Sequence, residues 1–138
     1  MAVPMQVLMV DDSSADLLIA SKVIERRKPA DAPVTIHSVA SMAAAESRLR
    51  QSRFDCVLLD LHLPDGRGAE NVRTLHALAP DTPIVVLSGS ESPAVKDAAM
   101  GSGASAYVWK KPLRQADDLY AVMMSAIRGQ LSSEDHAR

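Results

Sequence analysis

Side chains able to do chemistry directly follow four short aliphatic segments of this sequence. They are Asp11 and Asp12, Asp60, Ser88, and Lys110 with Lys111 beside it. Three carboxylates packed together would raise one another's pKa, and a divalent cation would remove their repulsion. Oxygen ligands suit Mg²⁺, while a lysine and a hydroxyl group match the remaining oxygens of a phosphoryl group. The set is therefore suited to placing a phosphoryl group on a carboxylate.

The segments that precede these residues have the composition of buried strands. Branched aliphatic and aromatic residues predict strands covered on both faces, over 6–10, 34–39, 55–59, 83–87 and 104–109. Between them, apolar residues at helical spacing predict helices over 14–27, 41–52, 68–79, 93–102 and 114–129. Ser92 and Pro93 support the fourth helix, because serine favours the cap and proline the first helical position.

Strands that alternate with helices through short connections predict an α/β fold with a doubly wound, five-stranded parallel sheet. Ligands of such sheets bind at the carboxyl ends of the strands, so we expect the reactive side chains to converge on one edge. The β-rich segments disfavour an all-helical bundle. We expect residues 1–129 to form one domain and the polar residues 130–138 to be disordered.

Length and composition exclude several classes of protein. The 138 residues, 47% hydrophobic and 23% charged, suit one domain with a sizeable core. A net charge of −2 argues against nucleic acid bound through bulk charge. No apolar run approaches the roughly 18–20 residues needed to cross a bilayer, and the N-terminus lacks the basic region of a signal peptide. With a single cysteine, Cys56, the chain is expected to be cytoplasmic.

Four stretches together resemble the receiver domain of two-component response regulators. They are VLMVDDSSADLL, DCVLLDLHLPDGRG, PIVVLSGSES and GASAYVWKKP. Each is modest alone, but their order and spacing are specific, and the resemblance extends from about Val7 to Ile127. It implies a flavodoxin-like (βα)5 fold and a phosphorelay partner, either a sensor histidine kinase or a histidine phosphotransfer protein.

The resemblance also implies roles for the acids. Asp60 matches the phosphoacceptor, which would become an aspartyl phosphate. Asp12, Asp60 and the backbone carbonyl of His62 match the Mg²⁺ ligands. Asp11 matches the second acid of the pair, reaching the metal through water.

Further positions match the family's switch. Ser88 takes the place of the Ser or Thr that bonds the phosphoryl group, and Tyr107 matches an aromatic residue that moves with it. Their movement would reshape the surface formed by the fourth helix, the fifth strand and the fifth helix. His62 and Ser90 occupy positions that border the phosphoryl group in receivers and can alter its hydrolysis, although His62 as an exposed loop residue with no role fits equally well.

The active-site lysine has two candidates, because one extra residue precedes the proline of the family's pattern. Counting from Gly103 selects Lys110, and counting back from Pro112 selects Lys111. Successive strand side chains point to opposite faces, so the two are not equivalent. The spacing from Tyr107 favours Lys110. The displaced proline leaves open whether the peptide before Pro112 is cis, as it is in many receivers.

Two other functions compete with a phosphorylated switch. A phosphohydrolase of the haloacid-dehalogenase type has an Asp-x-Asp motif, whose second acid is missing from Asp60-Leu61-His62. A receiver-like binding module that does not switch would usually lack an acid or the lysine. We therefore expect a receiver that catalyses its own phosphorylation and dephosphorylation without being a conventional enzyme.

No output domain is expected in this chain, nor direct contact with nucleic acid or membrane. A monomer or a phosphorylation-dependent dimer is expected.

Overall fold

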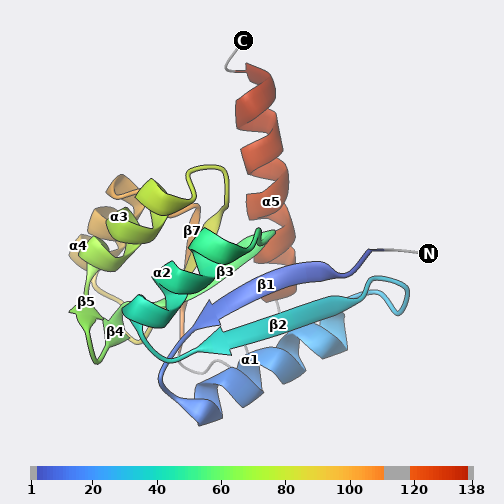
Figure 1. Ribbon diagram of the computed structural model, residues 1–138, viewed down its shortest axis with the longest axis horizontal. Coiled ribbons are helices and arrows are strands. Elements are labelled where there is room, and N and C mark those ends of the chain that lie inside the picture. The colour runs from blue at the N-terminus through green and yellow to red at the C-terminus, as the bar shows by residue number, and fades with distance from the viewer. Residues whose placement is uncertain (1–2, 111–118, 137–138) are drawn as a thin grey trace.

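The computed structural model describes residues 3–110 and 119–136, with side chains described up to residue 129. Its main sheet has five parallel strands in the order β2-β1-β3-β6-β7 (Figure 1). The strands, in that order, are Val34–Val39, Met5–Val10, Cys56–Asp60, Ile84–Ser88 and Ala106–Trp109. The predicted doubly wound parallel sheet is confirmed.

Helices cover both faces of this sheet. The first face carries α1 (Ser14–Arg27) and α5 (Leu119–His136), and the second carries α2 (Met42–Gln51), α3 (Ala69–Leu78) and α4 (Pro93–Gly101). In Figure 1, α1 and α2 lie on opposite sides of β1 and β2, and α5 projects beyond the sheet. This is the layered arrangement that short strand–helix alternation predicts.

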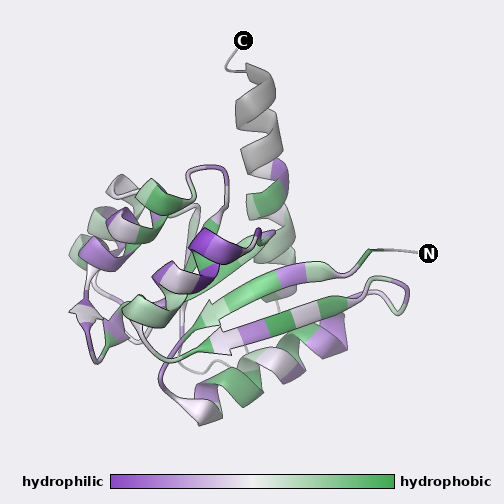
Figure 2. Cartoon of the chain, in the orientation of Figure 1, coloured by the Kyte–Doolittle hydropathy of each residue, from purple (hydrophilic) through white to green (hydrophobic). Residues whose placement is uncertain are grey.

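The alternation of side chains along each strand divides the core into two clusters. On β1, Leu8 and Val10 pack with the helices of the second face, whereas Val7 and Met9 pack with those of the first. Strands β3 and β6 are buried at every residue, as expected for central strands of a parallel sheet. Figure 2 shows that β1 is hydrophobic along most of its length, while α2 mixes hydrophilic and hydrophobic residues.

Serine side chains fix where the helices begin. The hydroxyl groups of Ser13, Ser41 and Ser92 accept hydrogen bonds from the backbone of the first turns of α1, α2 and α4. Each bond satisfies one of the free N–H groups at a helix start. The predicted start at Ser92 and Pro93 is confirmed.

A short hairpin between β3 and α3 was not predicted. Strands β4 (His62–Leu63) and β5 (Gly66–Arg67) pair antiparallel and form a second, two-stranded sheet. Asn71 of α3 is buried, and its Nδ2 donates to the carbonyl oxygen of Gly66 at 3.1 Å. The hairpin is therefore held against the helix that follows it.

One feature differs from the sequence-based bounds. Helix α5 runs to His136, so its backbone is helical past residue 129, where a disordered tail was expected. The predicted beginning of this helix at residue 114 lies outside the described residues, and the domain boundary at 129 stays a prediction.

Among the described residues, no helix is both long and apolar enough to cross a bilayer. The cytoplasmic location stays a prediction.

Candidate functional site

Three carboxylates meet at the carboxyl edge of the sheet. Strands β1 and β3 are parallel neighbours, and Val10 pairs with Leu59, so Asp11 and Asp60 end adjacent strands at the same level. Oxygens of Asp11, Asp12 and Asp60 all lie within 4.8 Å of one another. Asp11 and Asp60 are buried, while Asp12 is exposed. The structure thus brings together the acids that the sequence placed at strand ends.

The backbone holds the two buried carboxylates in place. The N–H of Ser13 donates to Asp11 Oδ1 at 2.9 Å, and the N–H of His62 donates to Asp60 Oδ1 at 3.1 Å. The second oxygen of Asp11, Oδ2, is buried and has no well-aligned hydrogen bond among the described residues, but it lies 2.8 Å from Lys110 Nζ. At that distance an ion pair compensates the buried charge.

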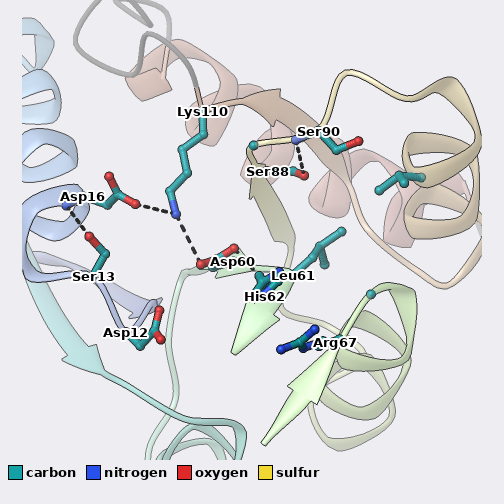
Figure 3. A pocket seen from close by; sticks show the side chains of 13 residues that line it. Asp12, Ser13, Asp16, Asp60, Leu61, His62, Arg67, Ser88, Ser90 and Lys110 are labelled. Atoms are coloured by element: carbon teal, nitrogen blue, oxygen red, sulfur yellow. Dashed lines mark hydrogen bonds and ion pairs between the residues drawn. The ribbon is translucent and has the colours of Figure 1, made fainter. Parts of the chain in front are cut away.

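Lys110 sits at the centre of the acids. Its Nζ lies 2.8 Å from Asp11, 2.7 Å from Asp16 and 3.2 Å from Asp60, measured to Oδ2 of each. Figure 3 draws the contacts with Asp16 and Asp60. Its backbone N–H donates to the carbonyl oxygen of Ser88 at 2.6 Å, which fixes where the lysine leaves β7. Lys111 lies outside the described residues, as does Pro112 with the peptide bond that precedes it. Lys110, the candidate selected by counting from Gly103, therefore reaches the acids.

Burial and charge move the pKa values of this cluster. Burial raises the pKa of the Asp60 carboxyl, and the nearby Lys110 ammonium opposes this rise. Burial alone would lower the pKa of Lys110, but the carboxylates of Asp11 and Asp16 hold it above its usual value. The lysine therefore stays charged.

A cavity of about 570 Å³ opens beside the cluster. Asp60, Ser88 and Lys110 line it, together with residues that the sequence analysis did not single out. Two of those are charged, Asp16 from α1 and Arg67 from β5. Figure 3 shows both beside the predicted residues.

The sequence held a signal for one of the two missed residues, Asp16, but none for the other, Arg67. Asp16 lies in the first turn of the helix that directly follows the acidic pair, so its place near the carboxyl edge of the sheet could have been inferred from the sequence. Arg67 pairs with His62 across the hairpin. Because that hairpin has no hydrophobic period, nothing in the sequence placed Arg67 at the cavity.

Two aromatic residues of β7 bind the loop that follows Ser88. Tyr107 donates its hydroxyl hydrogen to the carbonyl oxygen of Ser90 at 2.7 Å, and Trp109 Nε1 donates to that of Gly89 at 3.3 Å. The N–H of Ser90 donates to Ser88 Oγ at 3.1 Å. Movement of the Ser88 hydroxyl group would therefore alter the loop to which both aromatic side chains are hydrogen-bonded.

The donor set fits a hard divalent cation. It offers carboxylate oxygens only, which suit Mg²⁺, Ca²⁺ or Mn²⁺ rather than zinc or copper. Asp11 Oδ2, buried without a well-aligned hydrogen bond, is the kind of oxygen that a cation would satisfy. The assigned roles of these acids, of the His62 carbonyl and of Ser90 stay predictions.

A sequence model of the response regulator receiver domain matches residues 7–123. The chain belongs to the response regulator receiver domain family. Receiver domains bind Mg²⁺ at an acidic pocket, and they interact with histidine kinases or phosphotransfer proteins. The resemblance inferred from the four sequence stretches is thereby confirmed.

Curated relatives extend beyond the matched part. The cell cycle transcriptional regulator CtrA of Caulobacter vibrioides is 36% identical over 85 residues, which are 62% of this chain and 35% of the relative. CtrA of Brucella ovis is 39% identical over 85 residues, 62% of this chain and 34% of that one. This chain therefore spans about a third of the length of the curated relatives it matches.

Solved receiver structures share the fold. The CheY-like receiver domain protein from Methanospirillum hungatei JF-1 superposes with a TM-score of 0.77 at 24% identity, covering 95% of this chain and 99% of that chain. The Mn²⁺-bound form of the response regulator Rcp1 gives a TM-score of 0.68 at 24% identity, covering 85% and 94%. At such low identity these likenesses concern the fold alone.

Proposed function

We propose that this receiver domain accepts a phosphoryl group on Asp60 from the phosphohistidine of a sensor histidine kinase or a histidine phosphotransfer protein. The observation that carries this proposal is the position of Asp60, which lies at the cavity with Lys110 Nζ 3.2 Å from its Oδ2. The bond from Asp60 to phosphorus forms as the bond from phosphorus to the donor's imidazole breaks. The imidazole leaves with the proton on its other nitrogen.

Asp11, Asp12 and Asp60, with the backbone carbonyl of His62, would hold Mg²⁺. When bound, the cation would neutralise charge on the phosphoryl oxygens during transfer. Rcp1, which shares the fold, was solved in a Mn²⁺-bound form, so a divalent cation is compatible with a receiver of this fold. The all-oxygen donor set of this chain supports the Mg²⁺ assignment independently.

Lys110 and Ser88 would bind the phosphoryl group once it is on Asp60. The ammonium and the hydroxyl group both line the cavity and can donate to phosphoryl oxygens. Water then attacks phosphorus, the bond to Asp60 breaks, and inorganic phosphate leaves. His62 and Ser90 also line the cavity, so we propose that they modulate this hydrolysis.

The switch would act through Ser88 and Tyr107. When the Ser88 hydroxyl group turns toward the phosphoryl group, its bond from Ser90 N–H is lost, and Tyr107 is bonded to that same residue. The rearrangement would shift the population of the surface formed by α4, β7 and α5. An output partner, or a second copy of the chain, would then bind that surface.

Intact-protein mass after incubation with acetyl phosphate tests the proposal. We expect one added phosphoryl group with Mg²⁺, none with excess EDTA, and none in the Asp60→Asn variant. Asp81→Asn, in an exposed turn away from the cavity, is the matched control and should be labelled like the wild type. Labelling of Asp60→Asn to the wild-type extent would contradict the proposal. Absence of any adduct, together with no binding of beryllofluoride, would favour a receiver-like binding module that does not switch.

A further inference from the structure

Asp16 makes the shortest of the three contacts with the Lys110 ammonium. Its Oδ2 lies 2.7 Å from Lys110 Nζ, against 2.8 Å for Asp11 and 3.2 Å for Asp60. Figure 3 shows the Asp16 carboxylate directed from α1 toward the lysine. Ser13 fixes this turn, because its Oγ accepts from the Asp16 N–H at 3.2 Å.

Three carboxylates surround the Lys110 ammonium at ion-pair distance. A lysine side chain offers three N–H donors. A phosphoryl oxygen that approaches Lys110 therefore competes with these carboxylates for the ammonium.

Of the three carboxylates, Asp16 is the one that can give way. The Asp11 side chain is 1% exposed and bonded to the Ser13 backbone, and Asp60 would itself carry the phosphoryl group. The Asp16 side chain is 30% exposed at the cavity wall, so water can solvate it once it leaves the lysine. Its departure costs less than that of a buried acid.

We propose that Asp16 is a positioning residue that competes with the phosphoryl group for Lys110. This inference rests on the proposed function of Asp60. In the unphosphorylated protein Asp16 holds the ammonium toward α1. The phosphoryl group must displace it, and this competition lowers the affinity of the site for a phosphoryl-like anion.

A double-mutant cycle separates this competition from simple charge repulsion. Beryllofluoride binding at saturating Mg²⁺ is measured by calorimetry for the wild type, Asp16→Asn, Lys110→Ala and the double variant. We expect Asp16→Asn to bind roughly three- to tenfold more tightly than the wild type. In the Lys110→Ala background the same change should alter binding less than about twofold, because the contested group is gone.

Glu70→Gln is the matched control for removal of an acid. Glu70 lies in the first turn of α3 and pairs with Arg73, outside the cavity. Its substitution should leave beryllofluoride affinity unchanged.

A second readout serves if Lys110→Ala binds too weakly to measure. Repulsion between solvated charges is screened by salt, whereas a contact beside a largely buried lysine is screened less. We therefore expect the gain from Asp16→Asn to persist when KCl is raised from about 0.05 M to about 0.5 M.

Three results would overturn the inference and leave the proposed function standing. They are unchanged or weaker binding in Asp16→Asn, an equal gain in both lysine backgrounds, and a gain that disappears in high salt. Failure of the wild type itself to bind beryllofluoride with Mg²⁺ is a different outcome, since it would contradict the proposed function as well.

Discussion

Lys110 Nζ lies 3.2 Å from Asp60 Oδ2, although the two residues are fifty positions apart in the sequence. The parallel pairing of β3 with β6 and of β6 with β7 brings the two strand ends together. The contact joins the proposed phosphoacceptor to the one described cation whose ion pairs reach the buried acids. Several expected outcomes depend on this pairing.

Removal of the lysine should destabilise the metal-free protein. Lys110→Ala leaves the buried carboxylates of Asp11 and Asp60 without their counter-ion, so we expect a loss of about 2–3 kcal/mol in the free energy of unfolding. Mg²⁺ should restore part of it, because the cation supplies the missing charge. Urea unfolding with and without Mg²⁺ measures both effects. Lys96→Ala on α4 is the control, and an equal loss in that variant would contradict the account.

Asp60 should make metal-free stability fall as pH rises. Burial raises the pKa of Asp60 in the folded state, so the folded protein binds its proton more tightly than the unfolded chain does. Stability from this group is then greatest below its unfolded pKa and is lost as pH rises through its folded pKa. Asp60→Asn should raise the Tm at pH 7 in EDTA by about 2–4 °C, with a smaller gain near pH 4. A gain that does not depend on pH would rule out this explanation.

Asp65 should have the opposite pH dependence. Its carboxylate accepts hydrogen bonds from the N–H groups of Met42 at 2.8 Å and Ala43 at 3.0 Å, which lower its pKa. The stabilisation is present above the unfolded pKa and disappears as pH falls through the folded pKa. Asp65→Ala should lower the Tm at pH 7 by about 2–4 °C, and less at low pH, in thermal scans by circular dichroism. Asp81→Ala should leave the Tm unchanged, and an equal drop there would count against a stabilising role for the two hydrogen bonds to Asp65.

Trp109 should report on the Ser88 switch. It is the single tryptophan of the chain, and its Nε1 donates to the carbonyl oxygen of Gly89, next to Ser88. Binding of beryllofluoride with Mg²⁺ should change the fluorescence emission of Trp109 in the wild type. The Ser88→Ala variant should still bind the anion, but with a much smaller change in that emission. Ser105→Ala, outside the cavity, serves as the control. A full response in Ser88→Ala would show that the loop moves without the hydroxyl group.

The sequence predicted the layered fold because burial and periodicity carry its signal. The runs that became β3 and β6 are buried at every position, and such runs are recognised without long-range information. The convergence of Asp11 and Asp60 followed from parallel topology alone. The hairpin of β4 and β5 was missed because two-residue strands are too short to show a period.

Other parts of the site needed side-chain geometry. The contact of Asp16 with Lys110 depends on how the first turn of α1 faces the end of β7, which propensity does not determine. The choice between Lys110 and Lys111 depended on strand register, and counting residues alone left both in place. The pairing of Tyr107 with the backbone of Ser90 likewise depends on a loop conformation that no sequence pattern specifies.

The most direct test of the central claim is to locate the phosphoryl group. The protein is incubated with acetyl phosphate and Mg²⁺, and borohydride then reduces the acyl phosphate to homoserine before peptide mass spectrometry. The account predicts homoserine at position 60 and unmodified aspartate at the neighbouring Asp55 and Asp65. Homoserine at another aspartate, with position 60 unmodified, would contradict it.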